Sequence, residues 1–131
     1  MKRIGELFQT SDWKKEKHVP LIECPDSASS GSLFDIKVSV GKDVSHPNTT
    51  EHHIRWIQLF FQPQGEKVCY QIANIEFSAH GESTAGPNEG PVNTYHAASV
   101  SAMLKKSGTL YAMCFCNIHG LWESSKEITV Q

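Results

Sequence analysis

The stretch Ile54-Arg55-Trp56-Ile57-Gln58-Leu59-Phe60-Phe61 carries the strongest indication of the fold. Apolar residues fill most of its positions, but they do not recur with the period of a helix face. The pattern predicts a strand that is buried on both faces, or one with a β-bulge that shifts its register. The turn residues Pro63-Gln64-Gly65-Glu66 follow directly. We therefore predict a β-hairpin over residues 54–73.

Further strands are predicted on both sides of this hairpin, from apolar residues that alternate with polar ones. The strand-like segments outside it cover residues 34–40, 72–78, 92–104, 110–116 and 127–130. Loops rich in Gly, Pro, Asn, Ser or Thr separate them at 25–32, 45–53 and 79–91. About seven short strands with almost no helical period predict an all-β sandwich. With no internal repeat or linker, residues 1–131 are expected to form one domain.

Composition narrows the classes of function. A formal charge of −2 gives no broad basic field, so we do not expect a nucleic-acid partner. No apolar run reaches the roughly 20 residues of a membrane helix, and no signal-peptide core follows the charged start. We therefore expect a cytoplasmic protein. The four cysteines are then free thiols or metal ligands, and the seven histidines are a first indication of metal chemistry.

A compact pair of metal ligands lies at Cys116-Asn117-Ile118-His119-Gly120. One Cys-x-x-His is a weak signal, but His18, His46 and His52 also lie in non-strand segments beside predicted strands. Because a sandwich gathers its loops at two ends, these residues can meet at one end. Together they offer four imidazoles and one thiolate, which exceeds the four ligands that zinc prefers. The same set around a six-coordinate iron would leave one position open.

Glu16 and Lys17 directly precede His18, in a segment that ends at Pro20. Pro20 disfavours a helix at Val19, so the segment is expected to be extended or looped. In an extended chain Glu16 and His18 point to the same side, and Lys17 points away. A kink is needed if Glu16 and Lys17 are both to act at one centre.

The other histidines and cysteines have less ligand-like surroundings. His80 is expected to form hydrogen bonds within its loop, and His96 to lie in the middle of a strand. Cys24 and Cys69 are expected to be small buried or inert thiols. Cys114 shares a strand face with Cys116 and is a rival ligand outside the turn.

Four segments together resemble the signature segments of superoxide reductases, in particular the one-iron neelaredoxin class. They follow the same order as in that family and read Glu16-Lys17-His18-Val19-Pro20, His46-Pro47-Asn48-Thr49-Thr50-Glu51-His52-His53-Ile54, Ala79-His80-Gly81-Glu82-Ser83 and Cys116-Asn117-Ile118-His119-Gly120-Leu121-Trp122. The extra four-cysteine domain of the two-iron relatives is absent from this sequence.

The resemblance implies an immunoglobulin-like, seven-stranded antiparallel β-sandwich with one iron that cycles between Fe2+ and Fe3+. The implied equatorial ligands are His18, His46, His52 and His119, and Cys116 is the implied axial thiolate. Glu16 would ligate the ferric ion at the open position and leave it on reduction. Lys17 would supply a positive charge near that position, and His53 would be a non-ligating neighbour.

The implied activity is the one-electron reduction of superoxide to hydrogen peroxide without production of dioxygen. In this family the electron donor is typically rubredoxin, and the neelaredoxin class suggests a homotetramer. Two other classes remain open from the residues alone. One is a cupredoxin-like electron carrier, although no axial Met follows His119. The other is a binding module whose Cys/His cluster holds structural zinc.

Overall fold

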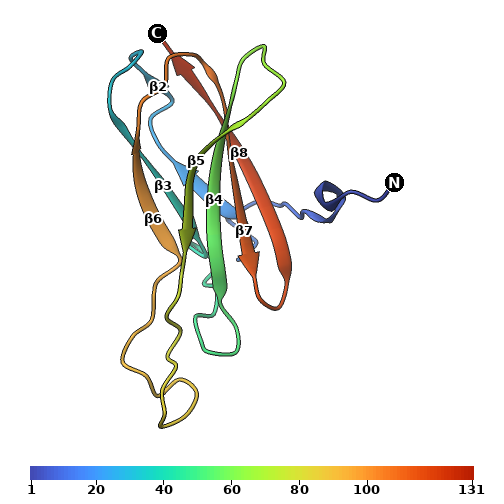
Figure 1. Cartoon of the computed structure of the whole chain (residues 1–131), viewed down its shortest axis with the longest axis vertical. Helices are drawn as coiled ribbons and strands as arrows, with labels where there is room; N and C mark the ends of the chain where they lie inside the picture. The colour runs from blue at the N-terminus through green and yellow to red at the C-terminus, as the bar shows by residue number, and fades with distance from the viewer.

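The computed structural model describes residues 1–131 and consists almost entirely of strands. Its elements are the 3-10 helix η1 (Ile4–Leu7) and the strands β1 (Pro20–Glu23), β2 (Ser27–Ala28), β3 (Phe34–Val40), β4 (Ile54–Pro63), β5 (Tyr70–Glu76), β6 (Ala97–Ala102), β7 (Gly108–Cys116) and β8 (Gly120–Val130). A three-stranded sheet, β1-β3-β6, faces a five-stranded sheet, β2-β8-β7-β4-β5 (Figure 1). The predicted all-β sandwich is confirmed. No helix of the structure has the length and apolar character needed to cross a membrane.

Strand β4 contains the irregularity that its sequence predicts. Its register with β7 shifts between Ile54 and Trp56, and its register with β5 shifts between Leu59 and Phe60. Ile57 and Leu59 are completely buried, whereas Trp56 and Phe60 are only half-buried on the opposite face. The bulged interpretation is therefore correct, and burial on both faces is not.

The core lies between the two sheets and takes one face of each central strand. The fully buried aliphatic side chains come from β3, β4 and β7, namely Ile36, Val38, Val40, Ile54, Ile57, Leu59 and Leu110. Burying such a side chain stabilises the fold by about 1.5–3 kcal/mol relative to exposure. The core therefore fixes the central strands whose ends carry the ligand loops.

The last strand is longer than predicted, and two short strands, β1 and β2, were not predicted. β8 pairs with β7 from Gly120 to Ile128, although its middle, residues 123–126, is entirely polar. Those residues belong to the strand because their backbone pairs with β7, so the strand forms without an apolar pattern at these positions. The predicted loop at 25–32 contains β2, which pairs parallel with the end of β8. The structure thus has eight strands and one parallel pair, where seven antiparallel strands were expected.

Strand β6 is shorter than the predicted strand at 92–104. It begins at Ala97, whose partner Ser39 is the last residue of β3 to pair with it. Residues 92–96 alternate in polarity but form no continuous ladder with a strand: Asn93 makes an isolated bridge with His80, and the carbonyl of His96 accepts from the N–H of Val40 at 3.0 Å. His96 therefore lies just before the strand and not in its middle.

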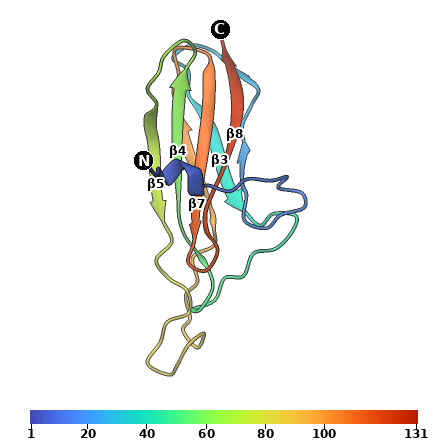
Figure 2. The ribbon, with the colours of Figure 1, turned by 90° about the vertical axis from the view of Figure 1, so that its right-hand side faces the viewer.

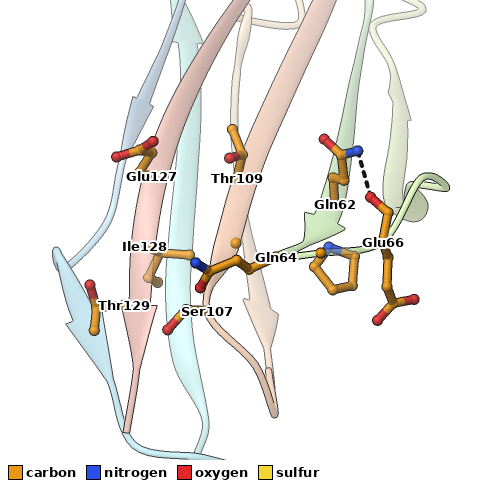
Figure 3. Close-up of a pocket in the computed structure, with 11 residues that line it drawn as sticks. Gln62, Gln64, Glu66, Ser107, Thr109, Glu127, Ile128 and Thr129 are labelled. Carbon is orange, nitrogen blue, oxygen red and sulfur yellow. Dashed lines mark hydrogen bonds between the residues drawn. The ribbon is translucent and has the colours of Figure 1, made fainter.

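The two ends of the sandwich differ in chemistry. The start of β4, the turn between β7 and β8 and the long loop between β5 and β6 lie at one end (Figures 1 and 2). At the other end, Gln62, Gln64 and Glu66 line a polar hollow of about 330 Å³ together with residues 127–129 of β8, and Gln64 extends toward Ile128 (Figure 3). This hollow contains neither His nor Cys. All the candidate ligands lie at the first end.

Candidate metal centre

Four of the predicted ligands converge at this end of the sandwich. The ligand atoms of His18, His52, Cys116 and His119 all lie within 4.8 Å of one another. His18 Nε2 is 3.1 Å from His119 Nδ1, and Cys116 Sγ is 3.8 Å from the same Nδ1 atom. His18 precedes β1, His52 precedes β4, and the other two residues bracket the β7–β8 turn. The fold thus brings together residues about 100 positions apart.

The β7–β8 turn fixes the Cys116/His119 pair by regular structure. Cys116 and Gly120 are the last paired residues of the hairpin, and Gly120 has φ +84°, a conformation that favours glycine. The backbone N–H of His119 donates to Cys116 Sγ at 3.4 Å. The carbonyl of His119 accepts from Gln9 Nε2 at 2.9 Å and from Trp122 Nε1 at 3.3 Å. A thiolate at Cys116 is therefore supported by a hydrogen-bond donor within its own turn.

His46 lies against this cluster. Its ring centroid is 4.9 Å from that of His18 and 4.8 Å from that of His52. Its Nδ1 atom donates to the carbonyl of Pro47 at 2.6 Å, which leaves Nε2 with a free lone pair. The Nε2 atoms of both His46 and His52 are buried and have no hydrogen-bond partner.

These unpartnered nitrogens test whether the residues fit a metal ion. Leaving a buried acceptor unsatisfied costs about 1–3 kcal/mol, and coordination would supply the missing partner. Burial is the main cause that lowers the pKa of His18 and His52, and it lowers the pKa of His46 to about 3. The imidazoles are therefore neutral near pH 7, as metal ligands must be. The nitrogen and sulfur donors fit a transition metal.

Glu16 contacts His18 from outside the cluster. Its Oε1 atom accepts from His18 Nδ1 at 2.6 Å and from the His18 backbone N–H at 3.0 Å. Glu16 and His18 therefore share a side, as expected, but the carboxylate binds the ring nitrogen remote from His119. Burial raises the pKa of Glu16, and the hydrogen bonds from His18 outweigh it, so the pKa lies below its ordinary value.

Lys17 lies in a bend over residues 17–19 and is half-buried. The bend departs from the strictly extended chain in which Lys17 would point away from Glu16 and His18. Burial is the main cause that lowers the pKa of His18 and His52, and the charge of His119 also contributes. The positive charge of Lys17 adds a smaller effect in the same direction.

Asn117 connects the two halves of the cluster, a role that was not predicted from the sequence. Its Oδ1 accepts from the backbone N–H of His53 at 2.9 Å, and its Nδ2 donates to the carbonyl of Glu51 at 2.8 Å. The backbone N–H of Asn117 also donates to the backbone carbonyl of His53 at 3.2 Å. The only signal in the sequence was its place inside the Cys-x-x-His turn.

The remaining histidines and cysteines lie outside the cluster. Cys114 donates through Sγ to the carbonyl of His18 at 3.1 Å, and burial raises the pKa of its thiol. His80 donates to Phe77 at 2.6 Å and stacks on His53 with ring centroids 3.5 Å apart, so its hydrogen-bonding role is confirmed. All four cysteines are free. Cys24 is half-buried, and Cys69 is exposed where a buried or inert thiol was expected.

Comparisons with known proteins agree with the resemblance of the four segments. The Desulfoferrodoxin family model matches residues 10–125. Neelaredoxin from Megalodesulfovibrio gigas is 54% identical over 129 residues, which cover 98% of this chain and 99% of the relative. Superoxide reductase from Pyrococcus furiosus is 52% identical over 128 residues, covering 98% of this chain and 99% of the relative.

A solved structure extends the likeness to the fold. Superoxide reductase (neelaredoxin) from Archaeoglobus fulgidus in the reduced form superposes with a TM-score of 0.87 at 52% identity. The match covers 94% of this chain and 98% of that one. Since the family model and these relatives span nearly all of the sequence, the chain belongs to the desulfoferrodoxin family.

Proposed function

We propose that the protein is a superoxide reductase, which reduces superoxide to hydrogen peroxide with one electron and two protons and forms no dioxygen. One observation carries the proposal: ligand atoms of three histidines and one cysteine lie within 4.8 Å of one another. Whole-length similarity to proteins named superoxide reductase and neelaredoxin supports the same activity.

The residues that would hold a single iron are His18, His46, His52, His119 and Cys116. The candidate donor nitrogens are the free Nε2 atoms of His46 and His52, the Nε2 atom of His18 and the Nδ1 atom of His119. The iron would supply the electron for superoxide by cycling between Fe2+ and Fe3+. The thiolate of Cys116 is electron-rich, and the N–H of His119 limits its donor strength.

Lys17 and Glu16 would control access to the centre. Superoxide is a small anion, so the positive charge of Lys17 should increase its rate of encounter. Glu16 would serve as the ferric ligand at the open position, and as a hydrogen-bond acceptor of His18 when it is not bound to metal. The 2.6 Å hydrogen bond between His18 Nδ1 and Glu16 Oε1 supports its role as an acceptor of His18.

The electron donor is proposed to be rubredoxin, in keeping with the family, and the compartment the cytoplasm. Four free cysteines support a reducing compartment, because thiols persist there without forming disulfides. The single sandwich of residues 1–131 is proposed to act as one domain.

A homotetramer is proposed as the assembly, and the outer face of the five-stranded sheet supports it. Half-buried Trp56 and Phe115 stack there with ring centroids 5.8 Å apart. An apolar hollow of about 360 Å³ beside Phe60 and Met113 continues this face. The N-terminal segment projects from the sandwich with Ile4 and Leu7 each 65% exposed (Figure 1). Contacts between subunits would cover these apolar groups.

Metal content measured together with superoxide consumption tests the function. The proposal expects stoichiometric hydrogen peroxide, no dioxygen, and consumption of one reductant-derived electron per superoxide. Release of dioxygen in half the molar amount of the superoxide consumed would instead identify a dismutase. A colourless zinc protein without activity would support a structural zinc module.

A further inference from the structure

The loop that carries His46 and His52 has little regular structure of its own. Residues 41–53 connect β3 to β4 and contain only bends and coil. Within the loop, the backbone N–H of Thr49 donates to the carbonyl of His52 at 2.9 Å, and the His52 N–H donates to Thr49 Oγ1 at 3.0 Å. These bonds close one turn but do not attach it to the sandwich. Support for these two ligands must come from neighbouring segments.

The loop between β5 and β6 supplies much of that support through Asn88. The Oδ1 atom of Asn88 accepts from the N–H of Thr50 at 2.8 Å, and the N–H of Asn88 donates to Thr50 Oγ1 at 3.1 Å. Its Nδ2 atom donates to both carboxylate oxygens of Glu51, at 2.9 Å and 3.0 Å. Asn88 therefore engages the two residues directly before His52 with its N–H and with both polar atoms of its side chain.

A second set of contacts joins the same two loops nearer to His46. Asn48 donates to the carbonyl of Thr94 at 3.2 Å, and its own carbonyl accepts from Asn93 at 3.2 Å. The hydroxyl of Thr50 donates to the carbonyl of His80 at 2.6 Å. The β5–β6 loop thus contacts the ligand loop at positions between the two histidines.

The β5–β6 loop is built to hold a fixed shape. Asn88 is the only residue other than glycine with positive φ, at 66°. This conformation is uncommon outside glycine, although Asn tolerates it better than most residues. The N–H of Gly90 donates to the carbonyl of Gly81 at 2.9 Å, and a Cβ at Gly90 would overlap the carbonyl of Glu82. The backbone is closely packed around Asn88, which allows it to act as a rigid support.

We propose that Asn88 is a positioning residue for the metal centre, which holds His52 through Thr50 and Glu51 in the arrangement that the metal requires. The inference rests on the proposed metal site and adds a residue about 36 positions away from His52 in sequence. Residues that orient ligands typically change metal affinity by about 10- to 100-fold when they are replaced. The loss of Asn88 should therefore alter the metal centre as well as the stability of the loop.

Two substitutions separate the side-chain contacts from the backbone conformation. Asn88→Gly retains the positive φ and removes the bonds to Thr50 N–H and Glu51, whereas Asn88→Ala also adds backbone strain. Glu89→Ala is the matched control, because Glu89 is exposed in the same loop and its side chain makes no hydrogen bond or ion pair. Each full-length protein is loaded with Co2+, whose visible bands report the ligand arrangement.

The expected result is a shifted Co2+ spectrum and roughly tenfold faster release of Co2+ to a chelator in Asn88→Gly, the lower end of the range for orienting residues. Glu89→Ala should match the wild type in both measurements. A wild-type spectrum and release rate in Asn88→Gly would overturn the inference, whatever the melting temperature does. If Asn88→Ala does not fold, Asn88→Gly alone decides. Failure of the wild type to bind Co2+ would instead reject the metal site itself, and the inference with it.

Discussion

The metal centre has two sides that are held in different ways. Cys116 and His119 lie on the β7–β8 hairpin, where a continuous ladder of paired residues ends at Gly120. His46 and His52 lie on a loop that is attached by side-chain hydrogen bonds from Asn88, Asn48 and Asn117. The hairpin side is fixed by backbone pairing. The loop side depends on a few amide side chains.

This difference predicts where the centre is weakest. A hairpin ladder opens only when the central strands separate, whereas loop contacts open with local free energies well below that of global unfolding. Asn117 is the direct bridge between the two sides, since it belongs to the turn and binds residues 51 and 53. Perturbations of the loop side should therefore change the centre before they change the sandwich.

Acid should produce the largest effect, in the metal-free protein. Burial is the main cause that lowers the pKa of His96, which packs against His46, to about 4. The unfolded chain binds a proton near pH 6.5 and the folded chain does not, so stability is complete above about pH 6.5 and falls as the pH decreases to about 4. The loss from this residue is about 3.5 kcal/mol, since the pKa differs by about 2.5 units and each unit corresponds to ~1.4 kcal/mol.

Hydrogen exchange across this pH window checks which side opens. Amides in residues 41–53 should lose protection first, and those of the β7–β8 hairpin last. His96→Asn, which cannot titrate, should make the melting temperature depend less steeply on pH, while the lowered pKa values of His18, His46 and His52 maintain the remaining dependence. Earlier loss of protection in the hairpin would contradict the comparison.

Asn117→Ala should have the next largest effect. It leaves the buried N–H of His53 without its acceptor, and an unsatisfied buried donor costs about 1–3 kcal/mol. Denaturant unfolding measures this loss directly. Ile118→Ala is the control in the same turn, where the side chain is 58% exposed, and it should change stability by less than about 0.5 kcal/mol. Equal effects of the two substitutions would mean that Asn117 does not bridge the two sides.

Lys17→Ala should slow the bimolecular reaction with superoxide by roughly 2- to 10-fold, because one charge supplies only part of the steering field. The rate should also depend less on ionic strength, as screening has less attraction to remove. Pulse radiolysis over a range of salt concentrations measures both quantities. Lys105→Ala removes an exposed positive charge from the opposite end of the molecule and serves as the control. An unchanged rate and salt dependence would exclude a steering role for Lys17.

Glu16→Ala should have the smallest effect on the rate. Superoxide reduction should remain largely intact, while the ferric protein becomes open to water or azide. The substitution also removes the acceptor of His18 Nδ1, so a modest change in the spectrum is expected without azide. Titration of the ferric protein with azide provides the measurement. A spectrum that does not respond to azide would argue against Glu16 as the occupant of the open position.

The sequence was sufficient for the longer strands that bury an apolar face, but not for the short strand β1, which also contributes Ile22 to the core. The bulged strand β4 and the alternating strand β3 both lie within their predicted segments, because their patterns record contact with the core. The polar middle of β8 has no alternating apolar pattern. Its pairing with β7 therefore becomes visible only in the structure. Residues 92–96 alternate in polarity but form no continuous ladder with a strand, and periodicity alone cannot reveal a missing neighbour.

The metal-ligating residues of the candidate site were predictable from the sequence, whereas the residues that support them were not. Its candidate ligands have distinctive chemistry, so His18, His52, Cys116 and His119 could be predicted from the sequence before their convergence was visible. The amides that support them could not, because Asn88 and Asn117 occur in loops where Asn is common for turn formation. Their role depends on contacts between segments 37 to 66 positions apart, which only the folded chain displays.

Iron content with visible and EPR spectra of the purified protein tests the central claim most directly. The account predicts one iron for each chain and a high-spin ferric signal. It also predicts a thiolate-to-ferric charge-transfer band that Cys116→Ser abolishes. A wild-type protein that instead holds zinc and is colourless, or that holds copper and shows an intense cupric-thiolate band, would contradict it.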